Sequence, residues 1–550
     1  MPLRTSGIPR PHVATLAAVA GSGAATAVLL APGLRPGYVL FLDHVAVPDP
    51  ARPTWEALTA PAGLRSWPLD AVVWAWSQAL PGWLLQQIIL VAAVLGAGLG
   101  TGVLLRRWGV AASFAASVLA IANPYVVERL LLGQGTLLLG YASIPWIVVA
   151  SRQRGPVRRV LLVTLASVPG ALTPWGGVLV GAVAVAVTVV RRRHLGELVC
   201  QAAASGALCL VWLVPALAGG SGGADESGAR AFGLAGESGI GMFVSALLGA
   251  GVWSSAAQVI RPGAPFIIAA VLLLMAIGVG AWSVLRRSAL QAGALLGSFV
   301  LVPLVASLLS GPLLHWWSRG QSVPGAALFR DLHRGLAVST FAMVVLAAVG
   351  LAAIITTVSE RRAAMMAPLA LVLPISLSVM LVPNGPGRLH DAYRPISFTE
   401  DWGPAMAVVG GDHGLVLSVP WQPLRRADWA PGVFLDPTPK SLGARALVDT
   451  TLTVTRDGVT IGVADRSPQG LHGSTQAGGE GEREIDTLRR ILSAGPGDPL
   501  PSGLLTSNGV AHVILWKESP GFVPRLPDEW RRTFAGEHLE VWSDPGVTTR

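Results

Sequence analysis

The sequence of 550 residues has only two cysteines, 13% charged residues and almost no lysine. Cys200 and Cys209 lie in one apolar segment, where a helix holds them beyond the roughly 7 Å between Cα atoms that a disulfide tolerates. The arginines stand in short clusters between apolar runs, with no basic stripe interleaved with aromatic residues. The cysteines therefore say little about the redox compartment, and the arginine pattern does not indicate a nucleic acid partner.

The motifs of common catalysts are also absent. The sequence has no Walker sequence, no HExxH, no CxxC, and no GxSxG placed between a strand and a helix. The sequence therefore lacks the motifs that nucleotide hydrolysis and the familiar zinc-dependent reactions require, and no metal site is expected. Any chemistry has to come from isolated polar side chains.

Apolar residues are abundant, at 52% of the chain, and the mean hydropathy is +0.57. One water-soluble core cannot bury this much apolar surface, so the remaining apolar surface must face lipid. A span needs about 20 apolar residues, and somewhat fewer where the bilayer or the packing allows. The sequence predicts about eleven spans in a membrane domain over 1–385, at 12–34, 83–105, 109–126, 135–150, 158–171, 174–190, 197–219, 263–285, 289–310, 336–357 and 365–384.

Two parts of this predicted membrane domain can each be interpreted in two ways. The segments 158–171 and 174–190 are short and meet at a Pro-Trp-Gly turn, so they form either two crossings or one re-entrant hairpin. The first apolar run follows two arginines, as in a signal peptide, but no small-residue cleavage site is convincing. We expect it to be retained as the first helix.

Arginines mark one side of the predicted spans. About 15 of them lie in short connections on that side, against about nine in much longer loops on the other. This bias predicts a plasma membrane protein with a cytoplasmic N-terminus, and an odd number of spans places the C-terminus outside. The long outer loops are 35–82, 220–262 and 311–335, and residues 69–80 suit a helix lying at the bilayer interface.

The composition changes after Pro383, where charged residues return and long apolar runs stop. We therefore expect a polytopic α-helical membrane domain followed by an extracytoplasmic, β-rich α+β domain over 386–550. Alternating residues predict a hairpin at 451–463 and strands at 414–421, 510–516 and 539–542. A helix is expected at 485–492 and a flexible loop at 466–484.

The first candidate site directly follows the first span and contains Asp43, His44 and Asp49. A partly desolvated carboxylate at the mouth of a helical bundle can take a proton from an acceptor hydroxyl, so Asp43 is a candidate base. The alternative is that both acids are ordinary solvated loop residues. Asp70 is explained by its place at a helix N-terminus alone.

The second candidate site is a polar interruption between the third and fourth spans, which contains Glu128 and Arg129. A planar guanidinium binds phosphate oxygens bidentately, so Arg129 is a candidate phosphate ligand with Glu128 in support. In the alternative, the two residues pair with each other at the interface and the preceding Asn-Pro only reverses the chain.

The third candidate site lies just before the tenth span and contains Arg330, Asp331, His333 and Arg334. On a helix the two arginines share a face and present two guanidiniums to a lipid phosphate, with Asp331 and His333 in support. The alternative is a juxtamembrane anchor, although the positive-inside bias makes arginines on the outer side less expected.

These segments together resemble actinobacterial membrane glycosyltransferases of the GT-C fold, a class that includes arabinosyl- and mannosyltransferases of the mycobacterial envelope. The resemblance rests on the acid-containing first outer loop, the Pro-Leu-Asp-Ala sequence at 68–71, the run at 123–134 and the Phe-Arg-Asp sequence at 329–331. The β-rich domain, with Val-Pro-Trp at 419–421, is similar to the extracytoplasmic domains that some of these proteins carry.

The resemblance implies a polyprenyl-phosphate sugar as the donor, bound from the membrane lipid, and a cell-envelope glycan or glycolipid as the acceptor. The lipid-linked sugar is a co-substrate, any cofactor beyond it is left open, and the resemblance assigns the base to Asp43. The family has a close pair of acids, whereas Asp43 is followed here by His44 and then by Asp49. A glycolipid or polysaccharide translocator, or a non-catalytic assembly protein, explains the spans equally well, but the duplicated halves of many transporters are not found.

Overall fold

The computed structural model describes residues 11–59, 67–218, 226–323, 325–366, 368–411, 414–449, 451–456, 459–463, 491–492, 500 and 502–546. The chain forms two compact units. The first comprises Met1–Ala31, Ile88–Val211 and Gly228–His390, and the second Pro32–Gln87, Trp212–Ser227 and Asp391–Arg550. The first outer loop thus groups with the C-terminal part of the chain, and the division at residue 385 stays a prediction.

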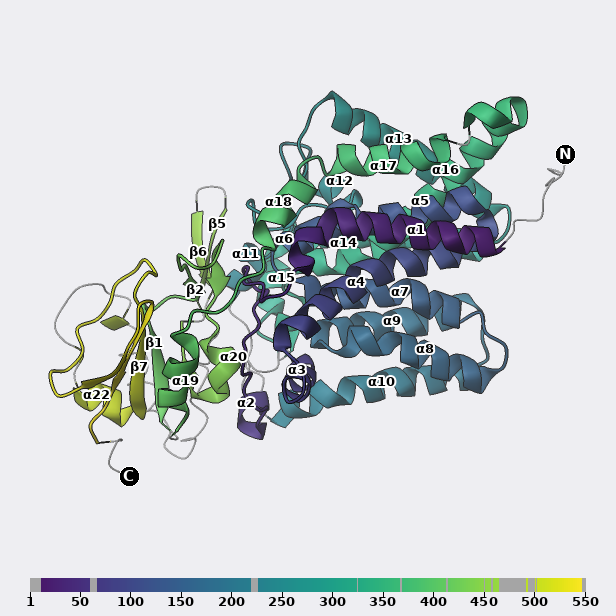
Figure 1. Ribbon diagram of the computed structural model, residues 1–550. Coiled ribbons are helices and arrows are strands. Elements are labelled where there is room, and N and C mark those ends of the chain that lie inside the picture. The colour runs from purple at the N-terminus through teal and green to yellow at the C-terminus, as the bar shows by residue number, and fades with distance from the viewer. Residues whose placement is uncertain are drawn as a thin grey trace. The chain divides into compact units, whose positions relative to one another are not determined.

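The first unit is helical, with α7, α8 and α9 packed side by side and α13 packed along α16 (Figure 1). Some of its helices contain a proline, as α7 contains Pro145 and α14 contains Pro303. Its principal helices are α1 (Pro11–Leu30), α4 (Gly82–Leu105), α5 (Val110–Ile121), α6 (Pro124–Leu131), α7 (Leu138–Ala150), α8 (Pro156–Ala171), α9 (Pro174–Val190), α10 (Leu195–Ala218), α13 (Ala264–Leu285), α14 (Ala289–Ser310), α16 (Leu336–Met366), α17 (Leu369–Leu381) and α18 (Gly385–Ala392).

The predicted number of spans is not confirmed. Each predicted span overlaps a helix, but within the described residues seven helices are long and apolar enough to cross a membrane, or eight if the bent pair α17 and α18 is one span. The predicted spans at 135–150, 158–171 and 174–190 form helices of 17 residues or fewer, shorter than the roughly 20 that a full crossing needs. The protein is therefore a mostly helical, multi-pass membrane protein in which eleven crossings are not confirmed.

Two glycines allow α13 and α16 to approach closely. A Cβ atom at Gly280 would lie 1.9 Å from the carbonyl oxygen of Leu346, and one at Gly350 would lie 1.8 Å from that of Ala276. Membrane helices commonly use small residues in this way, because backbones then gain van der Waals contact. Since α16 also packs against α5 and α14, it lies at the centre of the first unit.

The second unit contains a five-stranded sheet in the order β4-β1-β7-β9-β8 (Figure 1). The predicted strands are confirmed as β1 (Leu415–Val419), β7 (Val510–Trp516) and β9 (Leu539–Ser543), joined by β4 (Ala446–Leu447) and β8 (Arg531–Ala535). The predicted hairpin forms from β5 (Leu452–Arg456) and β6 (Val459–Val463). The expected loop at 466–484 and most of the expected helix at 485–492 lie outside the described residues.

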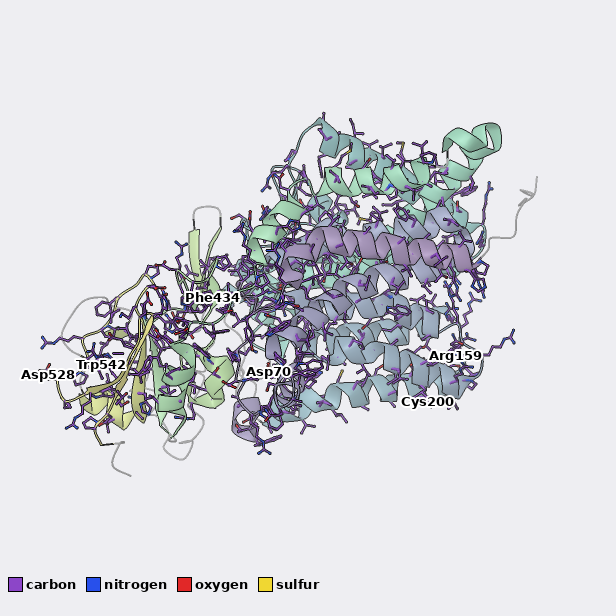
Figure 2. All side chains as sticks on the ribbon, viewed as in Figure 1. Asp70, Arg159, Cys200, Phe434, Asp528 and Trp542 are labelled. Carbon is purple, nitrogen blue, oxygen red and sulfur yellow. The ribbon has the colours of Figure 1, made fainter. Side chains whose placement is uncertain are left out.

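The sheet is mixed, because β1 pairs parallel with β4 and β7 while β9 pairs antiparallel with β7 and β8. Its central strands β1 and β7 are apolar on both faces. Val416, Ile514 and Trp516 face helix α19 (Trp402–Gly410), while Leu417, Val419 and Val513 face helix α22 (Ser502–Ser507) and its neighbours. The first outer loop adds Leu40 and Val47 to the core that contains Trp402, and Phe434 belongs to this core too (Figure 2). This loop also forms the expected helix, as α3 (Leu69–Ser77), whose place at the bilayer interface stays a prediction.

Candidate functional site

Helix α6 places Glu128 and Arg129 inside the first unit. The Asn123 side chain caps this helix by accepting a hydrogen bond from the Val126 N–H at 3.0 Å, and Pro124 begins the helix. The Asn-Pro sequence therefore starts a short helix instead of only reversing the chain. All eight residues of α6 are buried, so its two charged side chains need partners inside the protein.

Arg129 finds its principal partner in Asp331. Its two Nη atoms donate to the two carboxylate oxygens of Asp331, at 2.7 and 2.9 Å, and the side chains are 0% and 3% exposed. Nη1 also donates to Oε1 of Gln134 at 2.6 Å, and Nη2 lies 2.8 Å from Nδ1 of His333. The second and third candidate sites therefore meet, although 202 residues separate them in sequence.

Glu128 extends this network on the other side of the imidazole. Its Oε2 lies 3.1 Å from Nε2 of His333 and accepts a hydrogen bond from the Val252 N–H at 3.2 Å. The ring of Tyr125 stacks on the His333 ring with centroids 5.4 Å apart. Glu128 thus pairs with His333, whereas the structural alternative expected from the sequence paired it with Arg129.

Glu237 is a buried acid that the sequence analysis did not single out as a site residue. Its side chain is fully buried, and its carboxylate accepts hydrogen bonds from the N–H groups of Gly251 at 2.6 Å and Ile260 at 2.9 Å. It also interacts electrostatically with Glu128. Its only signal in the sequence was its place in a glycine-rich outer loop that also contains Asp225 and Glu226.

Arg330 and Arg334 are the half-buried cations beside this network. Nε of Arg334 donates to Oδ2 of Asp331 at 3.2 Å, and the Arg334 side chain is 24% exposed. The Arg330 guanidinium lies 4.6 Å from the centre of the Phe232 ring. The expected shared helix face is wrong, because Asp331 has an extended ψ of 88° that separates two short 3₁₀ turns, Ala326–Phe329 and Leu332–Gly335.

Asp331 connects the buried Arg129 to the half-buried Arg334. Burial alone would raise the pKa of its carboxyl, but the guanidiniums of Arg129 and Arg334 hold that pKa below its ordinary value. Asp331 therefore stays ionised and fixes the position of Arg334. In the described part of the chain, no group of three or more His, Cys, Asp or Glu residues could hold a metal ion.

Asp43 lies in the second unit, at the tip of a tight turn. The N–H groups of Phe41 and His44 each donate to the other residue's carbonyl, at 3.1 and 2.8 Å, and Leu42 has a φ of 45°. The Leu42 N–H donates to the Val433 carbonyl at 2.9 Å, which ties the turn to the domain. The Asp43 side chain is exposed on this fixed turn.

His44 and Asp49 have different surroundings from each other. His44 is buried, and burial lowers its pKa to about 4, so its imidazole is neutral near pH 7. Its ring lies 5.2 Å from that of Tyr393. Asp49 is exposed. Because Asp43 belongs to the second unit and the arginines to the first, their expected proximity stays a prediction.

The apolar helices define a multi-pass membrane protein, and the fold of this chain is similar to that of a known membrane glycosyltransferase. This fold is shown by a solved structure, the arabinofuranosyltransferase AftD from mycobacteria, to which the chain is similar with a TM-score of 0.55. The match has 15% sequence identity and covers 96% of this chain. The resemblance noted in the sequence is therefore confirmed at the level of the fold.

The other comparisons add little. A mutant form of AftD matches with a TM-score of 0.53 and 15% identity over 96% of this chain. The chain covers only 39% and 41% of the two AftD chains. An oligosaccharyltransferase from Archaeoglobus fulgidus matches with 11% identity over 91% of this chain and 67% of its own, but a TM-score of 0.37 has no bearing on the fold. No family model and no curated protein matches.

Proposed function

We propose that this chain transfers a sugar from a polyprenyl-phosphate donor to a cell-envelope glycan or glycolipid on the outer face of the membrane. The observation that supports this most is the placement of Arg334, a partly exposed guanidinium held by Asp331, which the buried Arg129 anchors in turn. The likeness of the fold to an arabinofuranosyltransferase supports the same reaction class. The N-terminus is cytoplasmic in this proposal, and the second unit is extracytoplasmic.

The donor phosphate binds Arg334 and Arg330 in this proposal. A guanidinium offers several N–H donors in a plane that matches phosphate oxygens. Both Nη atoms of Arg129 are already engaged by buried partners, so we assign Arg129 a positioning role instead of a direct phosphate contact. The Trp175 and Phe329 rings, 5.5 Å apart, add aromatic surface next to Arg330 for the first isoprene units.

Asp43 is the proposed base. Its carboxylate takes the proton of the acceptor hydroxyl while that oxygen bonds to the anomeric carbon, and the bond from this carbon to the phosphate oxygen breaks. The arginines stabilise the charge on the departing lipid phosphate. An exposed carboxylate on a turn that the domain core holds is accessible to an acceptor and has a defined position. The neutral, buried His44 supports the turn.

The test separates donor binding from turnover. Asp43→Asn keeps the size of the side chain but removes the base, so transfer should be lost while donor binding stays nearly intact. Arg334→Ala removes a charge-assisted phosphate contact and should weaken donor binding by roughly 1.5–3 kcal/mol. Glu400→Gln, at an exposed acid of the same unit that belongs to no candidate site, is the matched control and should transfer like the wild type.

Both quantities can be measured on purified protein in detergent, with a radiolabelled polyprenyl-phosphate sugar for binding and product formation for turnover. Full transfer by an Asp43→Asn protein that inserts and folds normally would remove Asp43 from the mechanism. Donor binding without transfer in the wild type, combined with movement of the lipid across a vesicle membrane, would favour the translocator instead.

A further inference from the structure

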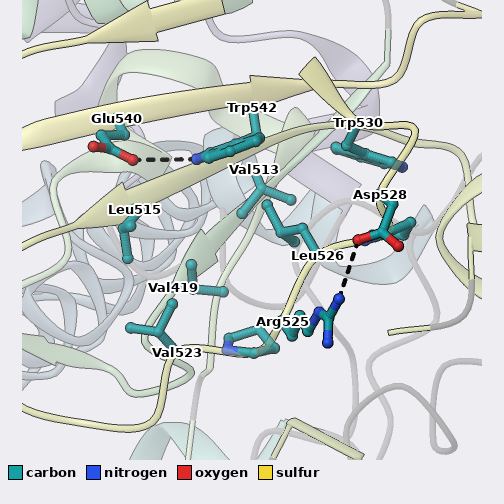
Figure 3. A pocket seen from close by; sticks show the side chains of 12 residues that line it. Val419, Val513, Leu515, Val523, Arg525, Leu526, Asp528, Trp530, Glu540 and Trp542 are labelled. Atoms are coloured by element: carbon teal, nitrogen blue, oxygen red, sulfur yellow. Dashed lines mark hydrogen bonds and ion pairs between the residues drawn. The ribbon is translucent and has the colours of Figure 1, made fainter. Parts of the chain in front are cut away.

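A cavity of about 370 Å³ lies on one face of the sheet in the second unit. One wall is apolar and comes from side chains of neighbouring strands, namely Val419 on β1 and Val513 and Leu515 on β7. The opposite wall is the segment from 523 to 530, which runs over the sheet (Figure 3). Its volume lies within the range of about 300–1,000 Å³ that small-molecule sites usually have.

Two tryptophans line this cavity. Trp530 is 4% exposed and forms part of the core, whereas Trp542 on β9 is only half-buried. The indole Nε1 of Trp542 donates to Oε2 of Glu540 at 3.3 Å, which fixes the ring in the cavity wall (Figure 3). A large aromatic surface is therefore held in place and remains partly open to a ligand.

The rim of the cavity carries charges of both signs. Nη2 of Arg525 lies 3.3 Å from Oδ1 of Asp528, and these side chains are 68% and 88% exposed. Glu540 is 14% exposed and lies 3.3 Å from a guanidinium nitrogen of Arg532. Asp528 and Trp542 also appear at the same end of the second unit in Figure 2. The site thus combines an aromatic wall with carboxylate acceptors and guanidinium donors.

This combination matches the chemistry of a sugar. A pyranose or furanose ring has an apolar C–H face that packs on an aromatic ring and a polar edge of hydroxyl groups that both donate and accept hydrogen bonds. At the rim of the cavity, carboxylates can accept hydrogen bonds from these hydroxyl groups and guanidiniums can donate hydrogen bonds to them. An acyl chain would leave these charges without a role, and a phosphate would meet two carboxylates.

We infer that this cavity binds an oligosaccharide segment, with Trp542 as the stacking platform and Asp528 and Glu540 as acceptors of sugar hydroxyls. The inference goes beyond the transfer reaction, because glycan binding here does not require turnover. Its test therefore uses no donor, and a failed result would leave the proposed function standing.

The experiment measures binding of soluble arabinofuranosyl and mannosyl oligosaccharides to immobilised full-length protein. Trp542→Ala should weaken binding about tenfold or more, and Trp542→Phe, which keeps an aromatic face, should lie between it and the wild type. Asp528→Asn should weaken binding about tenfold as well. The matched controls are Trp55→Ala and Glu529→Gln, exposed residues that do not line the cavity and should bind like the wild type.

Three results would overturn the inference. One is a wild-type protein that binds none of these oligosaccharides. Another is Trp542→Ala protein with the wild-type melting temperature and the wild-type affinity. The third is a fatty acyl chain that displaces the oligosaccharide and binds Asp528→Asn as well as the wild type, which would identify an apolar occupant.

Discussion

Arg129 and Asp331 are buried charges that compensate each other. Asp331→Asn removes the negative charge and leaves a buried guanidinium without its ion partner, which costs about 3–5 kcal/mol. We therefore expect a clear fall in the melting temperature of the purified protein in detergent. The matched control is Asp391→Asn, which breaks an ion pair with Arg394 that is 61% and 74% exposed and should change stability by less than about 1 kcal/mol. Equal melting of the two variants would contradict the network described here.

The second residue-scale prediction concerns pH and His44. Burial lowers its pKa from the ordinary 6.5 to about 4, so the unfolded chain takes up a proton more readily than the folded one. The stability that His44 contributes is therefore complete above about pH 6.5 and is lost as the pH falls toward 4. The lowered pKa of Asp331 also makes the folded protein less stable as the pH falls, but this effect begins only below about its ordinary pKa of 3.8.

Melting temperatures measured from pH 7.5 to 4.5 test this for His44. The wild type should lose stability across that range, and His44→Gln, which has no titrating group, should lose less. Parallel curves for the two proteins would show that His44 does not have the protonation assigned here.

Residue type alone located much of the candidate site. Ionisable groups next to apolar spans are costly, which is why Glu128, Arg129, Asp331 and His333 could be selected from the sequence. Their partners could not be predicted, because the pair of Arg129 and Asp331 joins segments 202 residues apart and no local pattern encodes it. Glu237 could not be selected either, because its partners are backbone N–H groups, which no side-chain pattern in the sequence reveals.

At the scale of elements, the packing of α13 on α16 depends on glycine. Gly280→Val would place side-chain atoms against the Leu346 carbonyl, and such overpacking costs about 1–3 kcal/mol or more. Gly278→Val is a matched control in the same helix, because a Cβ atom there meets nothing within 4 Å. We expect the first variant to melt earlier and to aggregate on gel filtration, while the second behaves like the wild type. The opposite order would place the helix contact elsewhere.

The elements themselves were largely predictable, because long apolar runs and alternating strands are local signals. The strands β1, β7 and β9 and the helices α13 and α14 fall where the sequence indicated. The expected single helix around Arg330 and Arg334 did not form, since the backbone at Asp331 is not helical. Short apolar helices such as α9 also gave the same signal as full spans, which is why counting crossings from hydropathy alone was unreliable.

At the scale of the whole molecule, the grouping of the first outer loop with the C-terminal domain was not visible in the sequence. Leu40 and Val47 belong to the same core as Trp402, and contacts between parts of the chain so far apart cannot be inferred from composition. This grouping gives Asp43 a fixed support in the core that the C-terminal part of the chain forms. The sidedness itself still rests on the arginine distribution.

The function that we propose is transfer of a sugar from a lipid-linked donor. The most direct measurement is an assay of purified wild-type protein with a panel of polyprenyl-phosphate sugars and envelope glycan acceptors. We predict that one donor gives a glycosylated acceptor and releases polyprenyl phosphate in equal amount, and that Asp43→Asn gives neither. Absence of transfer from every donor in the panel, with protein that still binds a polyprenyl-phosphate sugar, would contradict this account.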